Sequence, residues 1–180
     1  MNIFAIDRDP AQAAEWMVDT HVVKMVLETC QLLSTAHRVL DGEMYIDKTK
    51  TGRKVKRWRL PDGRENIIYS ATHINHPSTK WVQESVENYN WLVDHLFALI
   101  DEYSYRYEKT HKCSGELAYA LSSPPYNLKN WDWTDIPPAM DNQYIISEDF
   151  VENYRNYYKH GKKHLHSWKK RNPPEWMKVA

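Results

Sequence analysis

Three residues that could perform acid–base or amine chemistry lie on one stripe of a predicted helix. His21, Lys24 and Glu28 are separated by three and four positions, so at about 100° per residue they share one helical face. A carboxylate can move protons, an imidazole can orient or transfer them, and an unprotonated amine can act as a nucleophile. The same residues could instead form a structural network, with Lys24 and Glu28 paired one turn apart.

The segment that must position these side chains runs from His21 to Arg38 without Gly or Pro. Good helix formers fill it and predict one long helix, which the Asp41-Gly42 pair ends. Gln31, Thr35 and Arg38 continue the polar stripe, while apolar residues occupy the flanks and back. Surface helices usually have a wide polar face and a narrower apolar stripe. The reversed proportion here predicts a central helix whose polar stripe faces a cleft or an internal polar network.

The composition fits one domain. The chain has 180 residues, of which 42% are hydrophobic and 27% charged, enough for a single core. No apolar run reaches the roughly 18 residues of a membrane span, and the N-terminus lacks the pattern of a secretory signal. Cys30 and Cys113 stand outside any CxxC motif, which fits a reducing compartment. We expect a cytoplasmic protein without a membrane partner.

The formal net charge of zero conceals a strongly basic segment. Residues 48–64 contain eight Lys and Arg against one Asp, an excess of about seven positive charges. Such an excess could bind DNA phosphates, with Trp58 available to stack on a base. A solvated hairpin fits equally well, because charged edge strands resist aggregation. A turn signal at Pro61-Asp62-Gly63 predicts a β-hairpin with one strand before it and one after it.

The remaining pattern is helical. Apolar periodicity, capping residues and Pro positions predict helices at Pro10 to about Val18, Ser78 to about Tyr107, Glu116–Leu121 and a last helix capped by Ser147. The opening MNIFAID reads as a short strand or an extended segment, and residues 122–142 as a long loop. We predict a mainly α, single-domain helical bundle around the central helix. Residues 1–42 and 70–180 form its core, and residues 43–69 form a small basic β-hairpin insertion.

Further polar side chains are candidates for contact with a substrate or with nucleic acid. His73 and His76 are three positions apart but have no acid or thiol at ligand spacing, so we expect no metal there. Arg106 and Lys109 end the second long helix, where they suit the helix dipole or a phosphate. The full set of candidate contacts is Gln31, Arg38, Arg57, Trp58, Arg59, His76, Lys80, Arg106 and Lys109. No cofactor motif is present, and we expect no cofactor.

Three parts of the chain, in the same order, resemble the phage pyrimidine-dimer DNA glycosylases of the endonuclease V type. They are Asp19-Thr20-His21 through Glu28, Asn75-His76-Pro77 before a helix, and Asn172-Pro173-Pro174-Glu175-Trp176. The resemblance implies a small helical enzyme with an N-terminal amine nucleophile, a catalytic Glu28 and a functional His21. It also implies double-stranded DNA as the partner and a phage-encoded protein in the host cytoplasm.

The departures from that family concern the amine and the DNA contacts. The family loses its initiator methionine to expose a small residue, whereas Asn2 is large for such trimming, so that Met1 would keep the amine. Lys24 is the possible substitute. In model peptides an α-amino group titrates near pH 8 and a lysine side chain near 10.4, which favours the N-terminal amine. The family has basic residues beside its glutamate and one turn after it, whereas the corresponding positions here are Leu27 and Gln31. Either the hairpin supplies the missing DNA contacts or the substrate differs.

The sequence therefore predicts a DNA glycosylase, with an AP-lyase step where an amine attacks the sugar. Glu28 is the acid/base, His21 orients or transfers a proton, and Met1 or Lys24 is the amine. Two alternatives remain open: a nucleotide-processing enzyme, which Mg²⁺ dependence would favour, and a non-catalytic protein that binds a nucleotide or a partner without turnover.

Overall fold

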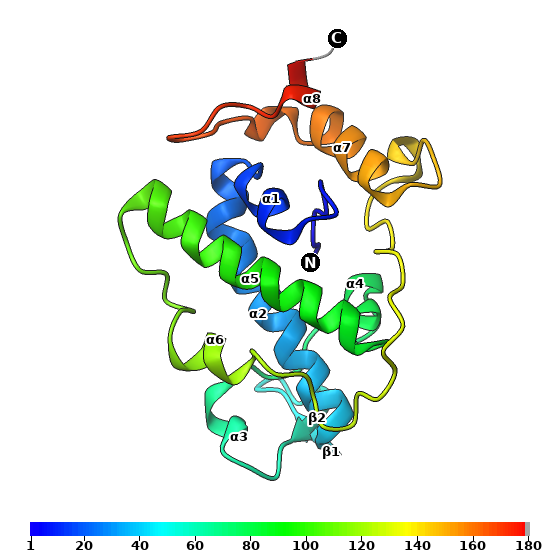
Figure 1. The fold of residues 1–180 in the computed structure, drawn as a ribbon. Coiled ribbons are helices and arrows are strands. Elements are labelled where there is room, and N and C mark those ends of the chain that lie inside the picture. Colours follow the sequence, from blue (N-terminus) through cyan, green and yellow to red (C-terminus); the bar gives the residue numbers. More distant parts are fainter. Residues whose placement is uncertain (179–180) are drawn as a thin grey trace.

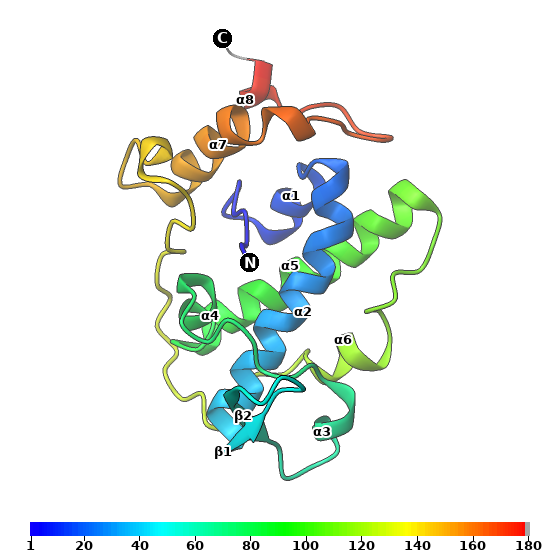
Figure 2. The same cartoon turned by 180° about the vertical axis from the view of Figure 1, so that it is seen from behind.

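Two long helices form the centre of the fold. The computed structural model describes residues 1–178, and in it α2 (Asp19–Asp41) packs against α5 (Val86–Tyr107). The two helices cross in Figure 1, and Figure 2 shows α2 in front of α5 from the other side. More than half of α2 is buried, including polar residues such as His21 and Arg38. The mainly α architecture and the mostly buried central helix are confirmed.

Short helices cover this pair. Asp9 caps α1 through bonds from the N–H groups of Ala11 and Gln12, as its position before Pro10 predicts. The C-terminal α7 and α8 lie near α1, at the end of α2 that begins the helix (Figure 1). The short elements are α1 (Pro10–Glu15), α3 (Arg64–Ile67), α4 (Pro77–Trp81), α6 (Glu116–Ala120), η1 (Asn142–Tyr144), α7 (Phe150–Gly161), η2 (Lys163–Leu165) and α8 (Glu175–Lys178).

The β-hairpin exists, but its turn lies earlier than predicted. Strands β1 (Glu43–Lys48) and β2 (Lys54–Arg59) pair antiparallel, and Gly52 in the turn has φ of 81°. The prediction of a second strand after Pro61–Gly63 was wrong, because residues 64–67 form α3. The Asp62 carboxylate accepts the N–H of Arg64 at 3.0 Å, which starts a helical turn instead of a strand.

Two helix starts also differ from the prediction. The expected helix from Ser78 to Tyr107 is broken between α4 and α5, because Ser85 caps a new start by accepting the N–H of Asn88 at 3.1 Å. Helix α7 is capped by Asp149, not Ser147, since the Asp149 carboxylate accepts the N–H of Val151. The first residues form no strand. Within residues 1–178, no helix has the length and apolar character needed to cross a membrane.

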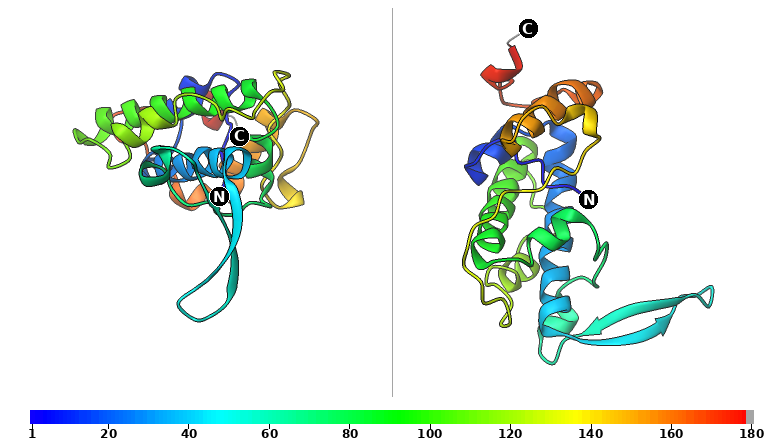
Figure 3. Two further views of the ribbon diagram at one scale, coloured as in Figure 1. Left: turned by 90° about the horizontal axis from the view of Figure 1, so that it is seen from below. Right: turned by 90° about the vertical axis from the view of Figure 1, so that its right-hand side faces the viewer.

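The hairpin projects from the body of the molecule. In the right panel of Figure 3 it extends from the C-terminal end of α2 toward the same side as the N-terminus and α4. Figure 2 views the molecule from that side, with α4 and the N-terminus beside α2. Residues far apart in the sequence therefore meet on one face.

Candidate active site

Glu28 is held between two nitrogen atoms halfway along α2. Its Oε1 lies 2.9 Å from Nζ of Lys24, and its Oε2 accepts the backbone N–H of Asn2 at 3.2 Å. The Glu28 side chain is 12% exposed and that of Lys24 is 67% exposed. The carboxylate is thus partly desolvated but still reachable, with one cation on its open side and the start of the chain on the other.

Asn2 anchors the N-terminus beside this carboxylate. Its buried side chain donates from Nδ2 to the Ala139 carbonyl at 2.7 Å, and its Oδ1 accepts the N–H groups of Ile3 and Phe4. Phe4 turns the chain with φ of 55°. These bonds fix the first residues although no regular element contains them. Sequence reasoning considered Asn2 only as an obstacle to trimming, but a polar residue heading an apolar segment was a signal of anchoring.

His76 forms a third side of the site. Its Nδ1 accepts the N–H of Ser78 at 3.2 Å and caps α4, so we assign its proton to Nε2. Burial holds the pKa of His76 below its usual value. The positive N-terminus and His73 act in the same direction, while the Glu28 carboxylate opposes them. The N-terminus and Glu28 are thus close enough to His76 for their charges to act on its ring.

Thr35 ties the histidine loop to α2. Its hydroxyl donates to the Gln31 carbonyl at 2.7 Å and accepts the N–H of Thr72 at 3.1 Å. The stripe of α2 therefore holds the loop that carries His76. Gln31 is partly exposed one turn beyond Glu28, and Lys80 is exposed on α4. Of the predicted site residues, the structure gathers Met1, Lys24, Glu28 and His76, which we call the Glu28 group.

His21 lies two helical turns before Glu28, about 10 Å along the axis, and makes different contacts. Tyr158 accepts the Val18 N–H at 3.1 Å and has its hydroxyl 2.8 Å from Nδ1 of His21, so we assign the tyrosine proton to that nitrogen. Burial, with smaller contributions from nearby Lys and His charges, lowers the pKa of His21 to about 3. The ring stacks on Phe4 with centroids 4.2 Å apart. This geometry supports an orienting role, through the N-terminal segment, more than proton transfer.

Two arginines expected to contact a phosphate are enclosed instead. Arg38 donates five hydrogen bonds, four of them to backbone carbonyls and one to the Glu65 carboxylate at 2.6 Å. Arg106 is fully buried, with Nε 2.6 Å from Glu102 and an N–H bonded to Asp19 at 2.9 Å. The structure does not support the expectation that they bind nucleic acid, because these contacts occupy their guanidinium groups away from the surface.

A basic groove of about 700 Å³ separates β2 from residues 71–74. Its lining includes Arg53, Lys54, Lys56, Arg57, Trp58 and His73. The loop that forms its other wall continues to His76. Arg57 pairs with Asp47 at 3.4 Å, and the Arg59 guanidinium lies over Tyr45. Lys109 is exposed just past the end of α5 and belongs to neither the groove nor the Glu28 group.

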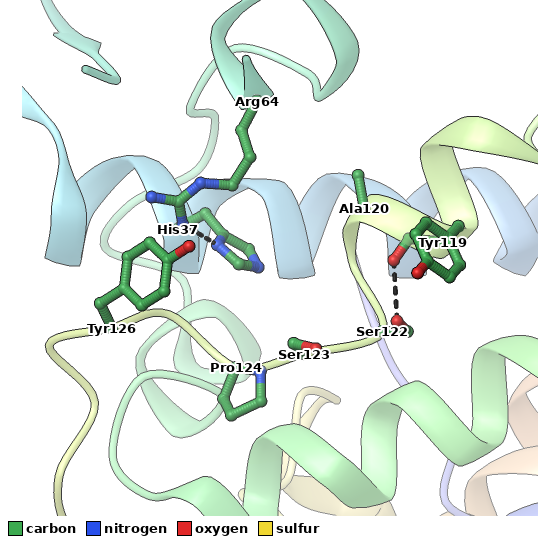
Figure 4. A pocket seen from close by; sticks show the side chains of 8 residues that line it. All are labelled: His37, Arg64, Tyr119, Ala120, Ser122, Ser123, Pro124 and Tyr126. Atoms are coloured by element: carbon green, nitrogen blue, oxygen red, sulfur yellow. Dashed lines mark hydrogen bonds between the residues drawn. The ribbon is translucent and has the colours of Figure 1, made fainter. Parts of the chain in front are cut away.

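A second cavity, of about 260 Å³, is a structural junction (Figure 4). Arg64 donates to Nδ1 of His37 at 2.7 Å and to Asp41 at 2.6 Å. Burial and the Arg64 charge lower the pKa of His37 to about 4, so its ring stays neutral as the acceptor. Asp41 also accepts the N–H groups of Tyr126 and Asn127. These bonds join α2, α3 and the loop after α6, and none of the Glu28 group lines this cavity.

The described part of the chain contains no cluster of three or more His, Cys, Asp or Glu side chains placed to hold a metal ion. Nδ1 of His73 is instead 2.7 Å from the Thr72 hydroxyl.

A model of the family described as pyrimidine dimer DNA glycosylase matches residues 1–115. The matched region contains Glu28, Lys24 and His76 and the whole hairpin. No curated protein and no solved structure matches the chain.

Proposed function

The chain belongs to the pyrimidine dimer DNA glycosylase family, and from this premise we propose that it is a DNA glycosylase with AP-lyase activity. Its substrate is a damaged or modified base in double-stranded DNA. The single observation that carries the proposal is the contact between the start of the chain and Glu28, where the Asn2 N–H lies 3.2 Å from the carboxylate.

The proposed reaction uses an amine and a carboxylate. The amine attacks the sugar C1′ and forms an N–C1′ bond, while the bond from C1′ to the base breaks and the base leaves with its electron pair and gains a proton. Glu28 stabilises the positive charge that develops on the sugar and moves protons as the ring opens to a Schiff base. A strand break then follows by elimination from that Schiff base.

The N-terminal α-amino group is the proposed nucleophile. Three hydrogen bonds of the Asn2 side chain hold Asn2 in place beside Glu28, whereas Lys24 is largely exposed and already paired with Glu28. If Met1 is retained, the amine belongs to the residue before the anchored Asn2. If Met1 is removed, the nitrogen of Asn2 becomes the amine, 3.2 Å from Glu28. In both cases the proposed nucleophile belongs to one of the first two residues, and the N–H of Asn2 contacts Glu28.

His76 and Lys24 complete the proposed site. The Nε2–H of His76 is available to donate a hydrogen bond to the sugar or its phosphate, because Nδ1 is used in capping α4. Exposed Lys24 supplies positive charge for a phosphate on the open side of Glu28. His21 packs against the N-terminal segment by stacking on Phe4.

The test is incubation with duplexes that each carry a single lesion or modified base, with and without borohydride. A cyclobutane pyrimidine dimer is the first substrate to try, because of the family membership. The proposal expects strand cleavage without borohydride and a covalent protein–DNA adduct with it. Base release without any adduct would replace the lyase by a glycosylase in which Glu28 activates water. Absence of both on every duplex would refute the proposed function.

A further inference from the structure

The register of the hairpin sorts its side chains onto two faces. Residues directly opposite each other in an antiparallel pair point to the same side of the sheet. The pairs Met44↔Trp58, Ile46↔Lys56 and Lys48↔Lys54 therefore form one face, and the intervening pairs Glu43↔Arg59, Tyr45↔Arg57 and Asp47↔Val55 form the other. We name the first set the lysine face and the second the paired face.

The paired face neutralises most of its own charge. Arg57 forms an ion pair with Asp47 at 3.4 Å, and the Arg59 guanidinium lies 5.2 Å from the centre of the Tyr45 ring. Glu43 stands directly opposite Arg59. Two acids thus oppose two arginines on this side.

The lysine face carries charge and apolar surface without such partners. It contains three exposed lysines and no acid, and within residues 1–178 none of the three is in an ion pair. Met44 is 48% exposed and Ile46 is 56% exposed. Exposing apolar side chains to water is unfavourable on a hairpin that projects into solvent. The combination of unpaired cations and apolar side chains is favourable, however, against a polyanion that also presents apolar groups.

We propose that the lysine face of the hairpin lies in the major groove of duplex DNA that flanks the base being excised. This inference rests on the proposed function, since it takes DNA as the substrate. The lysines contact the phosphates at the rims of the groove, and Met44 and Ile46 contact base edges such as thymine methyl groups.

The dimensions of the hairpin select the groove. Two strands lie about 4.8 Å apart, so that a two-stranded ribbon with its side chains fits the major groove, about 12 Å wide, and not the minor groove, about 6 Å wide. The hairpin projects on the side of the molecule that carries the N-terminus (Figure 3). A duplex at Glu28 therefore passes beside the ribbon, which reads neighbouring base pairs.

Dimethyl sulfate protection tests this placement, because the reagent methylates guanine N7 in the major groove and adenine N3 in the minor groove. The probe is a duplex of about 30 base pairs with a central tetrahydrofuran abasic analogue, long enough to include flanking phosphates. It carries no base to release at that site. The inference expects protection of guanine N7 in a segment beside the analogue, while adenine N3 in that segment stays reactive.

Substitutions on the two faces provide the comparison. Ile46→Ser, alone and with Met44→Ser, is expected to abolish the flanking N7 protection, whereas Val55→Ser on the paired face is expected to keep it. Lys54→Ala with Lys56→Ala is expected to reduce the salt slope of binding by about two times 0.9. A single Lys129→Ala, in a loop outside the hairpin, is the charge control. Circular dichroism establishes that each variant is folded.

The outcomes separate this inference from the function on which it rests. Protection of adenine N3 instead of guanine N7 overturns the groove assignment. Lysine-face variants that bind and protect like the parent overturn the role of the hairpin, even where excision of a lesion confirms the glycosylase. The parent protein could also form a dimer through the hairpin that DNA does not dissociate. That result would assign the lysine face to a second copy of the chain and would also overturn the inference. A parent that neither binds nor cleaves DNA contradicts the proposed function itself.

Discussion

The backbone N–H of Asn2 donates a hydrogen bond to Oε2 of Glu28 over 3.2 Å. This contact joins the first residues of the chain to the middle of its longest helix, 26 positions later. It places the residue that follows Met1 beside the carboxylate, and an α-amine and a carboxylate are the two groups that the proposed lyase requires.

Glu28→Gln is expected to lower the rate of base release by about 10²- to 10⁴-fold, because it removes the acid/base while keeping the shape. DNA affinity and the thermal midpoint are expected to stay close to those of the parent. Single-turnover kinetics on a lesion-containing duplex provide the measurement. Glu87→Gln, on an exposed position of α5, is the control. Full activity of Glu28→Gln would remove this residue from the mechanism.

Arg38→Met is expected to destabilise the fold by several kcal/mol, since each buried group left without its hydrogen-bond partner costs about 1–3 kcal/mol. The change leaves four carbonyls around Arg38 without their donor. Urea unfolding measures the difference, with exposed Arg53→Met as a control expected to change stability by less than about 0.5 kcal/mol. An Arg38→Met protein that is as stable as the parent but binds DNA with a shallower salt slope would show that Arg38 is a phosphate ligand after all.

Acid is expected to destabilise the fold through buried neutral histidines. Burial lowers the pKa of His95 to about 4, against an ordinary value of 6.5. Between these values the unfolded chain binds a proton that the folded chain does not, so stability falls as the pH drops from about 6.5 to about 4. Each such histidine adds a slope of up to about 1.4 kcal/mol per pH unit.

His95→Asn tests this linkage, because the amide can keep the bond that the ring makes to the Pro10 carbonyl at 2.8 Å. The slope of unfolding free energy against pH is expected to become shallower by about one proton in this variant. His160→Asn, at an exposed position, is expected to keep the slope of the parent. Equal slopes in His95→Asn and the parent would mean that His95 is not a source of acid sensitivity.

Local sequence patterns predicted α2 well, because helical periodicity and the Asp41-Gly42 signal are encoded within the segment itself. They could not show which residues of its polar stripe are exposed and which are covered. Lys24 and Arg38 both lie on that stripe, yet Lys24 is exposed and Arg38 is enclosed by carbonyls of residues 58–69. Which part of a stripe is covered depends on a distant segment, and periodicity carries no information about that segment.

The same limit applies to the site. Resemblance to a family suggested Glu28 and His21 as site residues, but it could not show that His21 contacts Tyr158, 137 positions away. The hairpin turn was misplaced because Pro61-Asp62-Gly63 carries a turn signal, whereas in the structure Asp62 accepts the N–H of Arg64 and the helix α3 follows instead of a strand. Asn2 was interpreted through its size, whereas its hydrogen bonds to Ala139 and to its own neighbours give it an anchoring role.

The salt dependence of DNA binding is expected to reflect the basic hairpin. The logarithm of the binding constant should fall linearly with the logarithm of salt concentration, by about 0.9 per phosphate neutralised. Replacing residues 49–53 and the flanking lysines of the hairpin by a short neutral turn should flatten this slope. Fluorescence anisotropy at several salt concentrations measures it. A slope that the shortened protein shares with the parent would move the phosphate contacts elsewhere on the molecule.

The most direct test of the account is the position of the covalent adduct after borohydride trapping on a lesion-containing duplex. Digestion and mass spectrometry are expected to locate the reduced linkage on the α-amine of the N-terminal residue, and to reveal whether that residue is Met1 or Asn2. An uncleaved N-terminal extension should suppress the adduct, while Lys24→Ala should still form it. An adduct on Lys24 that survives the extension and disappears in Lys24→Ala would contradict the assignment of the nucleophile.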